Sequence, residues 1–537
     1  MLAAVSLLAL GSAGVAAAGL IRGGSIDPQA ASPPCLTAMT SASPPASTTS
    51  ASTAITTVGP SGTTTVTAVG PTETISTTPP AATTATTTTT ATTTTTTDCQ
   101  TTVATATNTT PTVTTSSAAS TLVITGHGWG HGIGMGQWGA YGYALHGWSY
   151  TQILRHYYRG TSIATGPSPI VRILLLDQAR TVTLDSASPW RVVDRSHTTL
   201  ELPAGKLVVT ASLELDGHTL TTPLTFEPGA APLEVGKSAY RGRLIVSSEG
   251  KRLQVVNAVG LESYVAGVVG GEMPNTWPQA ALEAQAVAAR SYALAQLSSV
   301  VTASSFDLYD DTRSQVYGGI AAETPSTEQA VTATARRVVL YHGTVATTYF
   351  SSSSGGQTVS AAEALGTPIP YLVSVPDPYD TVSPNHDWGP VLVSARVAGK
   401  ALGLDGPVMG LGTTPAPSGR VAEVAASGPD TQRTLTGAQV EGALGLRSNW
   451  FEFAWLTLAP PPGPVAGGTA VSLEGAVRGL SGVSLEARTK GGVWQPAGPV
   501  TPDSTGAFTA RVTPTQTTFY RLATGTIRGA LIKVTVG

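Results

Sequence analysis

Apolar residues recur at helical spacing in two parts of the chain. The longer pattern predicts a buried helix that begins near Pro278 and runs through Leu282, Ala286, Ala289, Ala293 and Leu297. Pro278 suits the first helical position, where its missing N–H costs nothing. The second pattern predicts a helix that begins at Gln137 and another over residues 150–157.

Short aliphatic runs broken by Gly, Pro or Asp predict antiparallel strands between these helices. The runs cover residues 170–176, 181–184, 200–215, 233–235 and 244–246. Residues 265–269 are predicted as a further strand, followed by Gly270, Gly271 and the acidic Glu272. Glycines at a strand end let a ligand approach the backbone closely. The pattern predicts an α+β fold, with a mainly antiparallel β domain and a long central helix.

The last part of the chain has a different pattern. Residues 460–464 form a stiff proline-rich linker, and short alternating segments separated by turns follow it. Residues 466–537 are therefore predicted as a small C-terminal β-sandwich of immunoglobulin-like type, with strands near 471–473, 483–487, 508–512 and 519–522. The pattern does not distinguish a spacer from a binding module.

The N-terminal part differs in composition. Residues 1–21 are small and apolar and include an Ala16-Ala17-Ala18 run, which predicts a signal peptide or an N-terminal anchor and hence a secreted or cell envelope protein. Residues 32–118 are rich in Thr, Ser and Pro and have too few apolar residues for a core, so a disordered stalk is predicted. Cys35 and Cys99 both lie in this stalk, either as one bridge or as two separate thiols.

The charge pattern excludes some partners. The formal net charge is -3 and only 11% of residues are charged, so there is no basic surface for nucleic acid. Two cysteines cannot make a zinc cluster. His127 and His131 have the spacing of a helical metal pair, but the glycines between them argue against a helix. No metal and no cofactor are predicted.

Several sequence motifs together resemble those of a known protein family. Glu272-Met273-Pro274, Trp277-Pro278 and residues 284–290 follow one another, and a Gly-aromatic block precedes them at residues 128–140. With the Ser353, Gly355, Gly356 and Tyr371 region, residues 122–455 resemble the stage II sporulation protein D and amidase enhancer family (the SpoIID/LytB domain). In better-known members the Gly-aromatic block closes the domain, whereas here it opens it. A circular permutation explains this order if the ends of the domain lie close together.

The resemblance implies a function. It implies a lytic transglycosylase that cleaves peptidoglycan glycan strands between N-acetylmuramic acid and N-acetylglucosamine in cell wall remodelling, and the sequence does not distinguish a role in sporulation from one in division or growth. Glu272 would be the single acid/base. The residues that would bind substrate are Arg290, Glu283, Trp129, His131, Gln137, Ser353, Gly355, Gly356 and Tyr371. The alternative is a non-catalytic peptidoglycan-binding protein that enhances a cell wall amidase, its protein partner.

Two site residues have open alternatives. Arg290 either holds a substrate oxygen or forms an ion pair with Glu262. Glu283 replaces a Lys that many relatives carry, and it either pairs with a neighbour or supplies a second carboxylate. Burial near Met273 and Trp277 is expected to raise the pKa of Glu272. A nucleophilic Ser353 is rejected because the chain lacks the required turn pattern around it.

Overall fold

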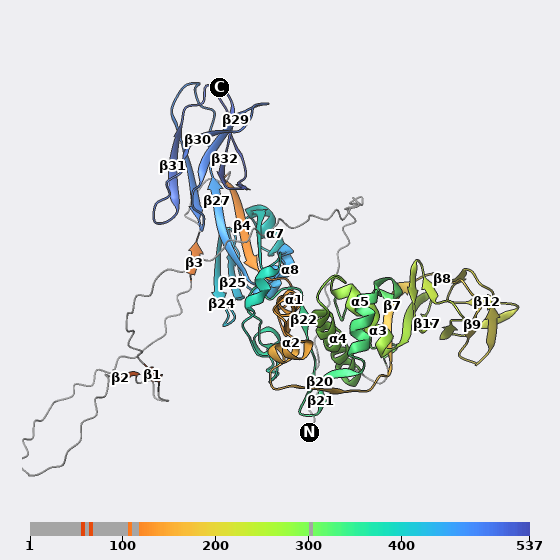
Figure 1. Cartoon of the computed structure of the whole chain (residues 1–537). Helices are drawn as coiled ribbons and strands as arrows, with labels where there is room; N and C mark the ends of the chain where they lie inside the picture. The colour runs from red at the N-terminus through yellow and green to blue at the C-terminus, as the bar shows by residue number, and fades with distance from the viewer. Residues whose placement is uncertain (1–54, 59–63, 68–105, 110–117, 300–303) are drawn as a thin grey trace, which may run out of the picture. The chain divides into compact units, whose positions relative to one another are not determined.

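The computed structural model describes residues 55–58, 64–67, 106–109, 118–299 and 304–537, and the chain divides into two compact units, residues 1–99 and 100–537 (Figure 1). The predicted signal peptide, Cys35 and Cys99 lie outside the described residues. Within the predicted stalk, β1 (Ile55–Val58) pairs with β2 (Thr64–Thr67), and β3 (Ala106–Thr109) pairs with β24 (Gly410–Pro415). These segments are strands, where the sequence predicted no secondary structure, because Thr and Val favour extended backbone.

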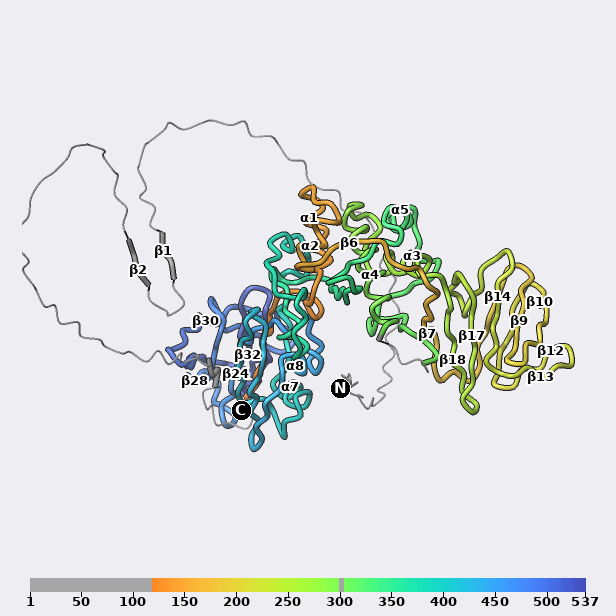
Figure 2. Tube along the Cα trace, turned by 90° about the horizontal axis from the view of Figure 1, so that it is seen from below, coloured from red at the N-terminus to blue at the C-terminus, as the bar shows by residue number. Residues whose placement is uncertain are grey.

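A seven-stranded sheet confirms the antiparallel strands of the middle region. Its order is β10-β9-β14-β17-β18-β7-β19, and β19 alone runs parallel to its neighbour β7. Figure 2 shows β9, β14, β17 and β18 side by side. The strands are β7 (Ile170–Ala179), β9 (Trp190–Val193), β10 (Thr199–Leu202), β14 (Leu224–Glu227), β17 (Arg243–Glu249), β18 (Arg252–Gly260) and β19 (Leu308–Tyr309).

Smaller strands complete this region. The sheet β11-β8-β15-β16 contributes Leu184, Val209 and Leu233 to a core shared with Phe226 and Val246 of the larger sheet. The strands are β8 (Val182–Ser186), β11 (Leu207–Val209), β15 (Leu233–Val235) and β16 (Ser238–Tyr240), with a separate hairpin of β12 (Leu213–Leu215) and β13 (His218–Leu220).

The predicted long helix is confirmed as α4 (Gln279–Ser299), which begins directly after Pro278. It packs against α3 (Leu261–Glu272), α5 (Pro325–Ala333) and β20 (Arg337–Tyr341). Its predicted core positions from Leu282 to Ala293 are fully buried. Because eight of its 21 residues are alanine, neighbouring elements approach it closely on several sides.

The strand predicted at residues 265–269 is wrong, because this segment belongs to the helix α3. Its valines favour extended backbone locally. Tertiary packing overrides this preference: a Cβ at Gly270 would collide with the carbonyl of Ala322, and one at Gly271 would lie 2.7 Å from the carbonyl of Val316. The glycines therefore admit a neighbouring segment of the protein and not a ligand.

The Gly-aromatic block leads from a strand into two helices. The predicted helices are confirmed as α1 (Gln137–Leu145) and α2 (Tyr150–Tyr157). Before them, β4 (Ala119–His127) pairs with β23 (Asp387–Ser394) and β27 (Phe451–Leu458), and β5 (Met135–Gly136) pairs with β22 (Phe350–Ser351). The remaining elements here are β6 (Ser162–Thr165), β21 (Thr344–Val345), α6 (Ala361–Leu365), α7 (Ala395–Ala401), β25 (Val421–Ser427), β26 (Gln432–Thr436) and α8 (Gly437–Leu444).

The C-terminal strands form two sheets around one core. The first is continuous with the preceding region, because β28 pairs with β27. The immunoglobulin-like type and the boundary near residues 455–466 stay predictions. The strands are β28 (Val471–Arg478), β29 (Ser484–Thr489), β30 (Gln495–Pro499), β31 (Ala507–Val512), β32 (Thr518–Thr524), β33 (Ile527–Arg528) and β34 (Ile532–Val534). Among the described residues, no helix has the length and hydrophobicity needed to span a membrane.

Candidate active site

Glu272 is the last residue of α3, and three segments of the chain meet at its side chain. The backbone N–H of Val316 donates to its Oε1 at 2.7 Å. The Nε2 of Gln137, the first residue of α1, donates to its Oε2 and to its backbone oxygen, both at 3.2 Å. The carboxylate is therefore held in one orientation while the side chain stays partly exposed.

Burial raises the pKa of Glu272, while the hydrogen bonds from Val316 and Gln137 lower it by a smaller amount. The cause of the net rise is removal from water, which disfavours the charged form. A neighbouring carboxylate does not contribute to the shift. Glu272 therefore holds its proton to a higher pH than an exposed Glu, as the sequence predicted and as a general acid requires.

The loop that supplies the Val316 N–H is fixed on both sides. The Nε2 of Gln315 donates to the Tyr264 hydroxyl at 3.3 Å, and the Tyr317 hydroxyl donates to Asn257 Oδ1 at 2.9 Å. The N–H of Gly318 also donates to the carbonyl of Gly267 in α3, at 3.1 Å. Because these contacts tie the loop to α3 and β18, the Val316 donor is preorganised against the carboxylate.

Three partly exposed aromatic side chains from the segments that supply Gln137 and Glu272 contact one another and form what we call the aromatic trio: Trp138, Tyr141 and Trp277. The Trp277 ring lies 4.7 Å from Trp138 and 4.8 Å from Tyr141, measured between ring centroids. Trp138 follows Gln137 in α1, and Trp277 lies between Glu272 and α4. Rings of this kind stack on apolar ligand faces. The sequence showed the aromatic residues of α1, but their contact with Trp277 depends on the tertiary fold.

The structure brings Gln137 to Glu272, but it places Arg290 elsewhere. Arg290 is fully buried, and its guanidinium donates to both carboxylate oxygens of Glu262, at 2.9 and 2.8 Å. Of the two alternatives for Arg290, the structure therefore shows the ion pair with Glu262. Glu283 is partly exposed on α4, where burial raises its pKa, and it has no contact with the Glu272 carboxylate.

The Ser353 loop is buried, and its hydrogen bonds to one carboxylate fix its shape. Ser353 Oγ and the N–H groups of Ser354 and Gly355 all donate to the buried carboxylate of Asp380. Gly355 and Gly356 both have positive φ, which this turn requires. Tyr371 is also buried, and its hydroxyl accepts the Thr347 N–H at 2.8 Å.

Trp129 and His131 are exposed in the Gly-aromatic block. Trp129 forms two backbone hydrogen bonds with Ser353, at 2.9 and 3.1 Å. His131 Nδ1 accepts the Ile133 N–H at 3.0 Å, whereas His127 Nδ1 pairs with Asp387. These two histidines therefore have separate partners. Across the residues that the structure describes, no group of three His, Cys, Asp or Glu side chains could hold a metal ion.

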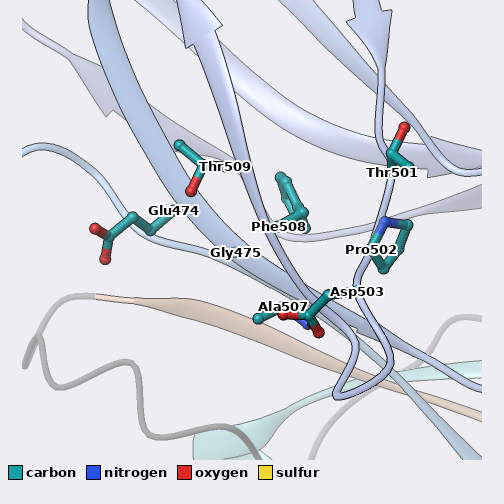
Figure 3. A pocket seen from close by; sticks show the side chains of 8 residues that line it. All are labelled: Glu474, Gly475, Thr501, Pro502, Asp503, Ala507, Phe508 and Thr509. Atoms are coloured by element: carbon teal, nitrogen blue, oxygen red, sulfur yellow. The ribbon is translucent and has the colours of Figure 1, made fainter.

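An open pocket of about 520 Å³ lies far along the chain from these residues, between β28, β31 and the loop before β31 (Figure 3). Glu474, Asp503 and Phe508 line it. None of the residues that the sequence predicted for the site lines this pocket. The candidate active site is instead the region around Glu272, because a carboxyl with a raised pKa is held there.

Comparison with known proteins covers this region. Residues 249–341 match the family model SpoIID, described as Stage II sporulation protein. Stage II sporulation protein D of Bacillus subtilis (strain 168) is 34% identical over 216 residues, which are 37% of this chain and 62% of that protein. The amidase enhancer of the same organism is 36% identical over 141 residues, 26% of this chain and 18% of that protein. A protein of Brachyspira hyodysenteriae is 41% identical over 136 residues, 25% of this chain and 37% of that protein.

The chain thus spans less than two thirds of the length of each of these relatives. The matched region contains Glu272, the Met-Pro and Trp-Pro pairs that follow it, α4 and the Val316 loop. The block that supplies Gln137 and Trp138 lies outside it. On this match and these motifs, residues 249–341 are a SpoIID domain, and the chain is similar there to the stage II sporulation protein D and amidase enhancer family, the SpoIID/LytB family.

Proposed function

We propose that this protein is a lytic transglycosylase that cleaves peptidoglycan glycan strands between N-acetylmuramic acid and N-acetylglucosamine during cell wall remodelling. The observation that carries this proposal is the carboxyl of Glu272, which is held by Val316 and Gln137 and has a pKa raised by burial. The aromatic trio, on the segments that supply Gln137 and Glu272, offers stacking surfaces for sugar rings. The name of the relative stage II sporulation protein D supports a role that includes sporulation.

The chemistry needs one carboxyl. Protonated Glu272 donates its proton to the glycosidic oxygen as the bond between that oxygen and C1 of N-acetylmuramic acid breaks. The resulting carboxylate accepts the proton of the same sugar's 6-hydroxyl as O6 bonds to C1. The product carries a 1,6-anhydro ring, no water is consumed, and Glu272 is protonated again.

A glycoside hydrolase would need a second carboxylate about 5–9.5 Å from the first. In the part of the chain that the structure describes, the Glu272 carboxylate contacts an amide side chain and a backbone N–H, and burial alone raises its pKa. This arrangement favours the one-carboxyl reaction.

Glu272→Gln tests the proposal because glutamine keeps the size of the side chain but cannot donate a carboxylic proton. Cleavage of purified glycan strands by the full chain should fall at least about 10²-fold, the lower range for general acid–base catalysis. Glu283→Gln is the matched control, since Glu283 is also a partly buried carboxyl with a raised pKa, and it should stay active. Mass spectrometry separates anhydro ends from reducing ends, because hydrolysis adds one water per cut.

Equal cleavage by Glu272→Gln and the wild type would refute the proposal. Reducing ends would instead identify a hydrolase, with Glu283 as the candidate second carboxylate, since Glu262 is paired with Arg290. The similarity to the amidase enhancer supports a second candidate, a non-catalytic glycan binder that stimulates a cell wall amidase. That candidate predicts that both the wild type and Glu272→Gln stimulate an amidase while neither cuts glycan strands.

A further inference from the structure

A second group of aromatic and polar side chains lies outside the Glu272 site, where three segments of the chain meet. We call it the Trp129 cluster, and its members are His127, Trp129, Asn385, His386, Arg447 and Trp450. His127 ends β4 and Trp129 follows it, Asn385 and His386 precede β23, and the last two lie between α8 and β27. Backbone hydrogen bonds join the segments, from Gly128 to His386, from Gly130 to Arg447 and from His127 to Trp450.

The Trp129 ring is exposed and yet held in place. It is 49% exposed, and the Arg447 guanidinium lies over it, 5.4 Å from the ring centroid. Arg447 is itself fixed by a hydrogen bond to the Asn385 side chain. Backbone pairing with Ser353 fixes the main chain of Trp129. A rigid aromatic ring on a polar surface is suited to stacking on the apolar face of a ligand.

Two oriented histidines belong to the same cluster, and the His127 ring packs against Trp450 at 5.1 Å between ring centroids. His127 Nδ1 pairs with Asp387 at 2.6 Å, and His386 Nδ1 pairs with the fully buried Asp380 at 3.0 Å. Their ring centroids are 6.5 Å apart, and both rings are partly exposed. Because each Nδ1 donates to a carboxylate, each Nε2 is the ring atom that remains to accept a hydrogen bond from a ligand hydroxyl.

The composition of the cluster selects the ligand class. A metal needs more ligands than two imidazoles, and no group of three His, Cys, Asp or Glu side chains suited to a metal occurs among the described residues. Asp380 and Asp387 beside the histidines disfavour a polyanion. A sugar ring has an apolar face for Trp129 and hydroxyls for the two Nε2 atoms and Arg447.

The cluster also lies close to the Glu272 site. The carbonyl of Ser352 accepts the Trp138 N–H at 3.0 Å, and the next carbonyl, that of Ser353, accepts the Trp129 N–H at 2.9 Å. The Trp138 and Trp129 backbones therefore bond to adjacent residues of one segment, which links the two sites.

We propose that the Trp129 cluster is a distal saccharide-binding subsite, which holds a sugar unit of the strand away from the bond that is cut. The choice of a peptidoglycan strand as ligand rests on the proposed function. The subsite makes binding depend on strand length, since a short ligand that fills the Glu272 site does not reach Trp129.

The test measures binding in the Glu272→Gln protein, with peptide-free glycan strands and with the disaccharide of N-acetylglucosamine and N-acetylmuramic acid as probes. Trp129→Ala should weaken strand binding at least about tenfold, the scale of a tryptophan anchor, and leave disaccharide binding unchanged. Trp129→Phe should restore most of the strand affinity, and His127→Gln should weaken it less. Trp494→Ala is the matched control, because Trp494 also has arginines over its ring, at 3.9 and 4.7 Å, without histidines beside it.

Equal strand affinity of Trp129→Ala and Trp494→Ala would overturn the subsite, as would an equal loss for strand and disaccharide. Absence of any glycan binding would overturn it as well. Failure of the proposed function is a separate result, because it is read from the cleavage products of the wild type. A protein that binds strands through Trp129 but cuts none would keep the subsite and refute the transglycosylase.

Discussion

Asp377 offers a quantitative test of the fold around the Gly-aromatic block. Its side chain is fully buried, Ser354 Oγ donates to its Oδ2 at 2.8 Å, and it packs against Gly136 and Gly139 at the start of α1. Burial and then the charge of Asp380 raise the pKa of Asp377 to about 7. The folded protein therefore holds a proton on Asp377 that the unfolded chain releases near its ordinary value of 3.8.

The sign and size of the effect follow from linkage. Between about pH 4 and pH 7 the folded state binds one more proton than the unfolded state, so the free energy of unfolding falls as the pH rises. A shift of about 3 pH units at about 1.4 kcal/mol each amounts to roughly 4 kcal/mol, lost by pH 7 and not recovered above it. Asparagine resembles the protonated acid and can still accept from Ser354. We therefore expect Asp377→Asn to match the wild type near pH 4 and to exceed its stability at pH 8 by up to about 4 kcal/mol.

Urea unfolding of the full chain, followed by tryptophan fluorescence at pH 4, 6 and 8, measures this difference. Asp194→Asn is the control of opposite sign. Burial acts to raise the pKa of Asp194, but backbone N–H groups of Thr198, Thr221 and Ser196 outweigh it and hold that pKa low, so its replacement should cost more stability at pH 8 than at pH 4. A stability difference for Asp377→Asn that does not change with pH would refute the reasoning.

Two further predictions concern packing and charge. Glu262→Gln should cost about 3 kcal/mol in urea unfolding, because it removes the counter-charge of the buried Arg290. The exposed pair of Asp311 and Arg313 is its control, and Asp311→Asn should cost no more than about 1 kcal/mol. Gly270→Ala should destabilise by about 1–3 kcal/mol despite the better helix propensity of alanine, because its Cβ meets the Ala322 carbonyl. Gly442→Ala in α8, where a Cβ meets nothing within 4 Å, should instead stabilise by up to about 1 kcal/mol, so a stabilising Gly270→Ala would contradict the packing argument.

Helices and strands that are specified by residues within or next to the element could be predicted from the sequence. The periodicity of α4 and the proline before it predicted a long buried helix, and alternation predicted β7, β15 and β17. The segment before Glu272 could not be predicted correctly, because its Val residues favour a strand and its Gly residues disfavour a helix by propensity. The contact that makes them helical involves residues 316–322, which no local pattern contains.

The candidate site could be predicted only in part for a similar reason. The motif identified Glu272, and its hydrophobic neighbours gave the direction of its pKa shift. The two groups that hold the carboxylate come from distant segments, and one of them is a backbone N–H, which carries no residue signature. For Arg290, an ion pair and a substrate contact were both consistent with the sequence, and the burial of its guanidinium against Glu262 shows which contact the fold makes.

The position of the Gly-aromatic block at the start of the domain also has a physical explanation. β4, which leads into the block, pairs with β27 along its whole length, from Phe451 opposite Gly126 to Leu458 opposite Ala119. The first and last strands of the 122–455 region therefore lie side by side in one sheet, which is the condition for a circular permutation. The contacts that place Gln137 on Glu272 and Trp129 on Ser353 depend on this pairing and on the Ser351–Ser353 segment. Since neither contact depends on which end of the chain supplies the block, the same site can be assembled with either order.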